Sequence, residues 1–239
     1  MRLLVDFLCR FGWGLSAGLV LTPTTLVPAG FFRVNLLVVL GLATFAALVA
    51  GQAVPGRGWL LPAVAAVVAW LGSVAWLAGR DRPGVASCLG CAGLLAAASW
   101  TLSAAGIGPA ALVSGLVVGL TVHAMLLGHW YLNAPGMDVG ALRRAIDAAL
   151  VAWGVELAAS LALAALAVAQ GGQAVPGGAT ATALVALRWL AGLAGLPVLL
   201  VMARRTLEIP NTQSATGILY VACLAAILGE LTSQLLLAA

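Results

Sequence analysis

Long apolar segments alternate with short polar breaks along the whole chain. Each apolar segment is roughly 20 residues long, the length that a helix needs to cross a hydrocarbon core about 30 Å thick. Helices satisfy their own backbone groups in lipid, and the segments lack the strict alternation of barrel strands. The pattern therefore predicts an all-α polytopic transmembrane helix bundle of about eight spans, at residues 11–27, 34–50, 59–78, 85–105, 110–131, 145–169, 180–203 and 212–237.

The breaks between these spans contain proline and glycine, which end helices and set tight turns. All the breaks are short, so we expect one integral-membrane domain over residues 1–239. Pro197 is expected to kink the seventh span, and Asn211 or Thr212 to cap the eighth. The sequence shows no clear internal repeat, although eight spans permit a four-plus-four duplication.

The composition agrees with a chain that lies in a lipid bilayer. Hydrophobic residues make up 63% of the sequence and charged residues only 8%, against about 45–50% and about 25% in soluble domains. So few charges could not cover a water-facing surface, which excludes a soluble globular enzyme and a disordered chain. The net charge of +4 comes from scattered arginines that form no patch for nucleic acid.

The arginines also predict how the chain is oriented. With both termini on the non-cytoplasmic side, seven arginines face the cytoplasm and three face outward, as the positive-inside rule requires. We therefore expect a multi-pass protein of the cell membrane in that orientation. The seven inner arginines are Arg33, Arg80, Arg82, Arg143, Arg144, Arg204 and Arg205, and the three outer ones are Arg2, Arg10 and Arg57.

Three charged residues lie inside the expected spans. Glu156 is near the middle of the sixth span, Arg188 about a third of the way into the seventh, and Glu230 at a similar depth in the eighth. Such charges are costly in lipid unless they are paired, protonated or exposed to water. Arg188 could pair with Glu230 or with Glu156. Two interpretations remain open: an ion pair that holds helices together, or a proton path, ion path or ligand contact in a cavity.

A second group of polar residues lies near the expected cytoplasmic rim. Aromatic residues at that depth are also typical of the interfacial belt. Together with the polar segment 21–30 they could build one pocket, and helix caps and interface anchors are the alternative. The candidates are the deeper His123 and, at the rim, His129, Tyr131, Asn133, Arg204 and Gln213.

Cofactor signals are weak. His123 and His129 are six residues apart, about 240° around a helix, so they cannot both ligate one haem iron. The pair Cys88 and Cys91 lacks the strand–helix context of a redox motif and the further ligands of a zinc site. We therefore expect neither haem nor a metal, and quinone is the cofactor that the rim residues suggest.

No catalytic motif occurs in the sequence. If the chain belongs to an enzyme, we expect it to be a non-catalytic membrane subunit. The first functional hypothesis is a membrane subunit or scaffold of a larger assembly, such as a respiratory, quinone-linked electron-transfer complex, with other membrane subunits as partners. In that case the quinone head group would contact His129, Tyr131, Arg204 or Gln213.

The second hypothesis is a small-molecule or ion transporter. It rests on Glu156, Arg188 and Glu230 inside the spans, and on the proline and glycine interruptions that are typical of transporter helices.

Overall fold

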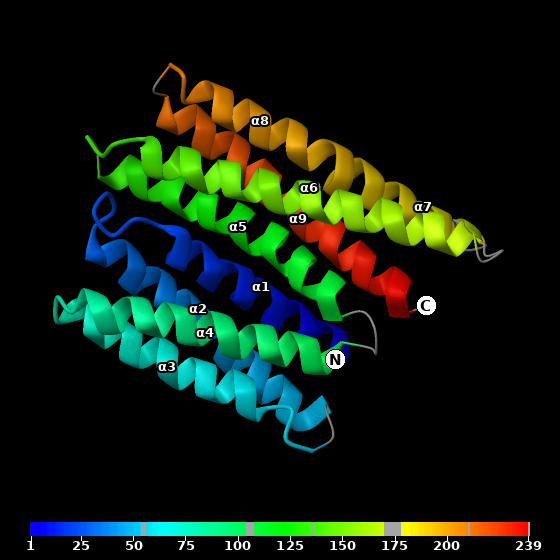
Figure 1. Ribbon diagram of the computed structural model, residues 1–239, viewed down its shortest axis with the longest axis horizontal. Coiled ribbons are helices and arrows are strands. Elements are labelled where there is room, and N and C mark those ends of the chain that lie inside the picture. The colour runs from blue at the N-terminus through cyan, green and yellow to red at the C-terminus, as the bar shows by residue number, and fades with distance from the viewer. Residues whose placement is uncertain (54–55, 104–107, 135, 170–177, 210, 239) are drawn as a thin grey trace.

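The computed structural model describes residues 1–53, 56–103, 108–134, 136–169, 178–209 and 211–238. These residues form helices and turns without strands, and eight helical spans among them are long and apolar enough to cross a membrane. The predicted all-α, eight-span fold is confirmed. Figure 1 shows the spans side by side, running alternately in opposite directions. They are α1 (Arg2–Leu21), α2 (Ala29–Ala53), α3 (Leu60–Leu77), α4 (Asp81–Leu102), α5 (Gly108–Asn133), α6 (Gly140–Ala169), a seventh span made of α7 (Ala179–Leu187), the π-helix η1 (Arg188–Gly195) and α8 (Leu196–Thr206), and α9 (Thr212–Ala238).

The first span differs from its predicted bounds. The sequence predicts residues 11–27, but α1 begins at Arg2 and ends at Leu21. Asp6 and Arg10 are therefore inside the helix and buried, where the sequence predicts a flanking position. They lie one turn apart and form an ion pair, so the two charges do not interrupt the span.

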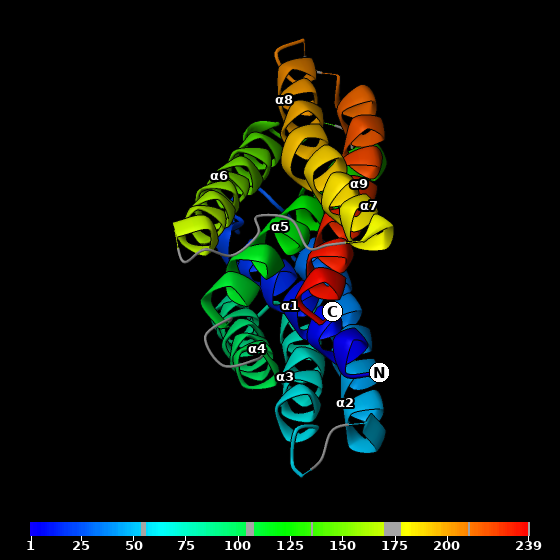
Figure 2. The same ribbon diagram turned by 90° about the vertical axis from the view of Figure 1, so that its right-hand side faces the viewer.

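The eight spans pack as two groups of four. In the first group α1 packs against α2 and α4, and α3 packs against the same two helices. In the second group α5 packs against α6 and α9, and α8 of the seventh span packs against those two. Figure 2 shows the groups end-on, with α1 and α5 at their junction. The spans thus have the same order of neighbours in both halves, as a four-plus-four arrangement requires.

Glycines let the two halves approach closely where α1 crosses α5. A Cβ atom on Gly14 would lie 2.0 Å from the carbonyl oxygen of Gly115, and one on Gly119 would lie 2.1 Å from the carbonyl carbon of Gly14. In lipid, close backbone packing replaces the hydrophobic effect as the force between helices. We call these three residues the glycine seam.

The seventh span is irregular just before its proline. Pro197 has no N–H for the carbonyl group four residues earlier, that of Leu193. The indole Nε1 of Trp153 on α6 donates to this carbonyl oxygen at 3.1 Å. The eight residues Arg188–Gly195, which end two positions before Pro197, form the π-helix η1. A π-helix is wider than an α-helix and is often found at functional sites. Pro197 was expected to kink the span, and the structure places the irregularity in the turns before it.

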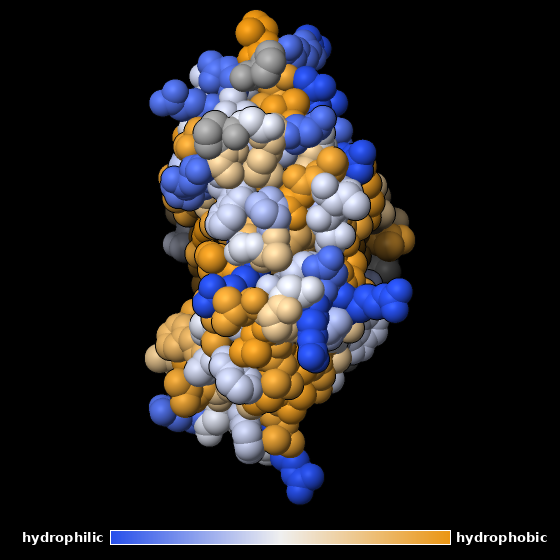
Figure 3. Space-filling view, turned by 90° about the vertical axis from the view of Figure 1, so that its left-hand side faces the viewer, coloured by the Kyte–Doolittle hydropathy of each residue, from blue (hydrophilic) through white to orange (hydrophobic). Residues whose placement is uncertain are grey.

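The two ends of the bundle differ in charge. One end, called here the arginine-rich end, holds the connections that precede α2, α4, α6 and α9, and the opposite end, the terminal end, holds both chain termini (Figure 1). Figure 3 shows polar side chains scattered among apolar ones on the arginine-rich end. There Arg143 donates to the carbonyl oxygen of Leu207 at 2.5 Å, and the Oδ1 atom of Asn211 caps α9 by accepting from the Ser214 amide at 2.9 Å.

Replacement of Gly14 by alanine is expected to lower the free energy of unfolding by about 1–3 kcal/mol, because the added methyl group meets backbone that cannot rotate away. Gly41→Ala in α2 is the matched control, since no heavy atom lies within 4 Å of its Cβ position. That change is expected to be neutral or to stabilise by up to about 1 kcal/mol. Unfolding by SDS titration in mixed micelles measures both. Equal effects at the two positions would contradict the glycine seam.

Candidate functional site

The guanidinium of Arg10 is a buried charged group inside the bundle. Its Nη2 atom lies 2.5 Å from Asp6 Oδ2 in the same helix, and its Nη1 atom lies 2.8 Å from Glu230 Oε1 in α9. Arg10 is 4% exposed and Glu230 3% exposed. The charged triad of Asp6, Arg10 and Glu230 therefore joins the first helix to the last, away from water.

The triad carries more negative than positive charge. One guanidinium faces two carboxylates, and the Oδ1 atom of Asp6 and the Oε2 atom of Glu230 have no hydrogen-bond partner among the described residues. Gln234 supports Glu230 from the next turn of α9, where its Nε2 donates to Glu230 Oε1 at 2.8 Å. The Ser114 hydroxyl lies 3.4 Å from Arg10 Nη1 and brings α5 to the same place.

Arg188 stands apart from this triad and binds two hydroxyl groups. Its Nη1 donates to Ser233 Oγ at 2.7 Å, and its Nη2 donates to Ser160 Oγ at 2.9 Å. No carboxylate oxygen lies within 4.0 Å of it among the residues that the structure describes. Neither of the two pairings that the sequence leaves open for Arg188, with Glu230 or with Glu156, is present among the described residues. Glu230 pairs instead with Arg10, which the sequence places at a membrane surface.

A cavity of about 290 Å³ lies between these groups. Arg10, Ser114, Glu156, Ser160, Arg188 and Ser233 supply its polar lining, and its apolar walls are Ala110, Ala111, Val113, Ala159, Leu163 and Leu237. The helices α1, α5, α6, η1 and α9 thus all contribute to one chamber. Arg10 and Arg188 lie about 12–14 Å along their spans from the terminal end, at 1.5 Å per residue. We call this space the Arg188 cavity.

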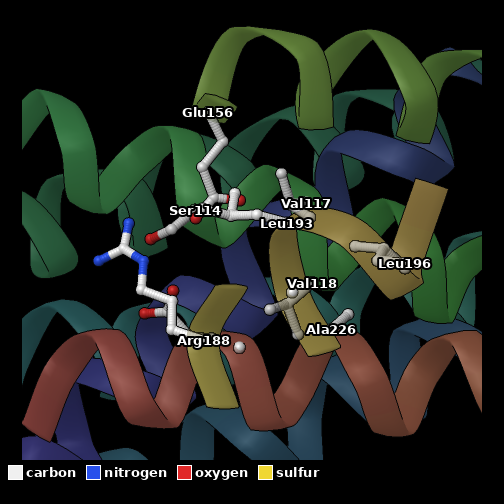
Figure 4. A pocket seen from close by; sticks show the side chains of 11 residues that line it. Ser114, Val117, Val118, Glu156, Arg188, Leu193, Leu196 and Ala226 are labelled. Atoms are coloured by element: carbon white, nitrogen blue, oxygen red, sulfur yellow. The ribbon is translucent and has the colours of Figure 1, made fainter. Parts of the chain in front are cut away.

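Glu156 lies at the inner end of the Arg188 cavity and also lines a smaller space beyond it. That space has a volume of about 10 Å³, roughly the room that one water molecule needs. In Figure 4 the side chains of Glu156 and Ser114 point into the same region, with the guanidinium of Arg188 beside them. Glu230 lines the space as well. The structure therefore brings together Glu156, Arg188 and Glu230, the three intramembrane candidates.

A third cavity, of about 20 Å³, follows nearer the arginine-rich end. His123 lines it together with Thr22 and Arg144. The Thr22 hydroxyl donates to the Gly18 carbonyl oxygen at 2.8 Å and lies 2.7 Å from His123 Nε2. Since that hydroxyl has only one hydrogen, Nε2 must be the donor in this contact. The buried Nδ1 atom of His123 then keeps a free lone pair.

The three cavities follow one another along α5 and α6. On α5 their lining passes from Ser114 through Val117 to His123, and on α6 it passes from Ser160 through Glu156 to Arg144. The polar groups that line these cavities thus form a row from the terminal end toward the arginine-rich end.

The rim candidates of the sequence do not come together in these cavities. The exposed His129 has its Nδ1 atom 3.2 Å from the Tyr220 hydroxyl, and the exposed Asn133 donates to the His129 carbonyl oxygen at 3.2 Å. The buried Tyr131 donates from its hydroxyl to the Asp138 carbonyl oxygen.

Two further rim candidates lie on other surfaces. Arg204 forms a partly exposed ion pair with Asp147 at 2.8 Å, and Gln213 is exposed near the start of α9.

Sequence reasoning missed several residues of the Arg188 cavity. The expected first span, residues 11–27, leaves Asp6 and Arg10 outside it, although an acid and a base four residues apart in an apolar segment already indicate a paired helical turn. Ser160 and Ser233 carry no comparable signal, because isolated serines are common in membrane helices. Among the described residues, no group of three His, Cys, Asp or Glu side chains has an arrangement that could hold a metal ion.

No protein-family model matches the chain, and no curated protein or solved structure matches it either. The site is therefore interpreted from its own geometry.

Replacement of Arg10 by glutamine is expected to lower the free energy of unfolding by about 3–5 kcal/mol, because two buried carboxylates lose the one cation that pairs with them in the described part of the chain. Arg204→Gln is the matched control, since its ion pair with Asp147 is partly exposed. Loss of such a pair costs less than about 1 kcal/mol. SDS titration again gives both values. A loss at Arg10 no larger than that at Arg204 would show that the triad does not hold the bundle together.

Proposed function

We propose that this chain is a membrane transporter for a small polar solute or ion. The observation that carries the proposal is the row of three cavities along α5 and α6, which contains Glu156, Arg188 and Glu230 at one end and His123 at the other. Ionisable groups inside a membrane protein mark substrate, ion and proton pathways, because lipid alone does not tolerate them.

The form of the seventh span supports this proposal. Transporters commonly bind their substrate where a helix is interrupted, and the π-helix η1 places Arg188 in such an interruption. Gly192 of η1 lies against Gly229 of α9, where a Cβ atom would come within 2.9 Å of the Gly229 Cα atom. With no side chain between them, the two backbones are in direct contact, so the interrupted part of the seventh span packs closely on α9 beside the cavity.

The packing of the two halves is a second support. Many transporters consist of two repeats with the binding site at their interface. The triad joins α1 of the first half to α9 of the second, so the Arg188 cavity lies at the junction of the halves. Between the second and third cavities the fully buried Ala149 of α6 provides no polar group. We infer that this conformation is closed toward the arginine-rich end.

The positive-inside rule gives the proposed orientation. The arginine-rich end faces the cytoplasm of the cell membrane, and the terminal end, with the Arg188 cavity, faces outward.

A second candidate function is that of a membrane subunit in a larger assembly, such as a quinone-linked complex. The contact between His129 and Tyr220 favours it, because both side chains are exposed on the outside of the bundle near the arginine-rich end. Mass spectrometry of the gently purified protein tests this candidate. Partner subunits or a quinone that co-purify with the unaltered protein and are lost when Tyr220 is replaced would support it. A protein that always purifies without partners or quinone would count against it.

Transport itself is tested in liposomes that contain the purified protein, with a panel of ions and small metabolites. We expect uptake of at least one solute, and a loss of about tenfold or more in Arg188→Gln, because hydrogen bonds to a charged group contribute about 1.5–3 kcal/mol. Arg57→Gln is the matched control: Arg57 is an exposed arginine near the terminal end and should leave uptake unchanged. Liposomes that stay impermeable to the whole panel would contradict the proposal.

A further inference from the structure

We propose that the Arg188 cavity binds a small organic oxyanion with a short apolar body, and that Glu156 takes up one proton when this anion binds. The inference rests on the proposed transport function, because it names the substrate class of that site.

The donors around Arg188 fit an oxyanion. Ser160 and Ser233 accept hydrogen bonds from the guanidinium, so the hydrogen of each hydroxyl is left to be donated elsewhere. Neither hydroxyl donates to another group among the described residues. A guanidinium flanked by two free hydroxyl donors provides several parallel hydrogen bonds for a carboxylate or phosphate, the groups that arginine binds best.

The charge of Arg188 is available to a ligand. Arg10 forms ion pairs with Asp6 and Glu230. Arg188 has hydroxyl partners only, within the part of the chain that the structure describes. Part of its side chain remains exposed, and it lines both the Arg188 cavity and the smaller space beyond. Among the two cations at this site, Arg188 is therefore the one that a bound anion can neutralise.

The rest of the Arg188 cavity is apolar and small. Alanine, valine and leucine side chains form its walls, and its volume of about 290 Å³ lies at the lower end of the roughly 300–1,000 Å³ range of ligand pockets. An inorganic ion would leave these walls uncovered. A short alkyl or similar body attached to the anionic group would fill the space and bury it from water.

The charge balance of the cavity calls for a proton. The charged groups that line the cavities beside Glu156 are Arg10 from α1, Arg188 from η1 and Glu230 from α9, while α5 contributes the neutral Ser114. Asp6 lies behind Arg10 as its ion-pair partner in α1. With all of them ionised, three carboxylates oppose two guanidiniums. An anion alone would add a second uncompensated negative charge in a lipid-surrounded site, which is costly. One added proton keeps the net charge the same before and after the anion binds.

Glu156 is the carboxylate that can accept this proton. Asp6 and Glu230 are held by Arg10, and a proton on either would break an ion pair. Glu156 has no hydrogen bond or ion pair to another described side chain, and it lines both the Arg188 cavity and the space beyond it. The proton adds to its carboxylate oxygen, while the bound anion stays ionised against Arg188.

The test compares four small probes in detergent solution by isothermal titration calorimetry: butyrate, monobutyl phosphate, butyramide and butylammonium. We expect at least one of the two oxyanions to bind, and the neutral amide and the cation to bind about tenfold more weakly or not at all. Arg188→Gln should weaken oxyanion binding about tenfold or more, and Arg57→Gln should leave it unchanged. Equal binding of butyramide, or of the oxyanions to Arg188→Gln, would overturn the proposal.

Titrations in buffers of different ionisation enthalpy measure the proton. At mildly alkaline pH the unaltered protein should take up about one proton with each anion, so its affinity should fall as pH rises. Glu156→Gln, which resembles the protonated side chain, should still bind the anion without taking up a proton. Proton uptake that persists in Glu156→Gln would refute the role of Glu156.

Two further outcomes separate this inference from its alternatives. An anionic phospholipid that co-purifies with the unaltered protein and is lost from Arg188→Gln would assign the site to a lipid head group and overturn the small-solute proposal. If the anion and proton bind as expected but liposomes stay impermeable, the transport function fails while the binding site stands.

Discussion

The contact between Arg10 and its two carboxylates is the interaction on which the rest of the structure depends. An isolated charge inside a membrane span is expensive, and so is each carboxylate that faces it. Asp6 and Arg10 already pair within α1, and Glu230 avoids this cost only where α9 brings it to Arg10. The first and last helices are thereby held together, and the glycine seam brings α5 against the same face of α1. Because Glu230 is paired with Arg10, Arg188 has only hydroxyl partners among the residues described, and the Arg188 cavity keeps a cation that a ligand can reach.

The number and type of spans could be predicted because lipid imposes a simple requirement on sequence. Every backbone group must be satisfied within the span, and nearly every side chain must be apolar, so hydropathy alone marks the helices. The beginning of α1 could not be predicted in this way. Asp6 and Arg10 lower the local hydropathy and thus resemble a membrane surface, although their ion pair makes them compatible with the bundle interior.

The site was only partly predictable because sequence gives the depth of a residue but not its neighbours. Their positions within the spans predict that Arg188 and Glu230 lie at a similar depth in the membrane. The structure places both beside Glu156 in one region. Which of them pair depends on which helices pack together, and the contact between Arg10 and Glu230 spans 220 positions of the chain. The rim residues were less informative. Polar and aromatic groups such as His129 and Tyr131 are expected at any membrane surface, so their presence did not distinguish a site from an interface.

The central claim is that water-soluble solutes reach the Arg188 cavity, as the proposed binding of a small anion requires. The most direct measurement is the labelling of single cysteines in liposomes by a charged thiol reagent that cannot cross the membrane. Ala159→Cys places a thiol in the cavity without removing a proposed donor, and Leu161→Cys places one on a nearby exposed position of α6 outside the cavity lining. The four native cysteines are buried and should contribute little. Labelling is expected at position 159, blocked by a bound oxyanion, and none at 161; equal labelling of the two positions, or none at 159, would contradict the claim.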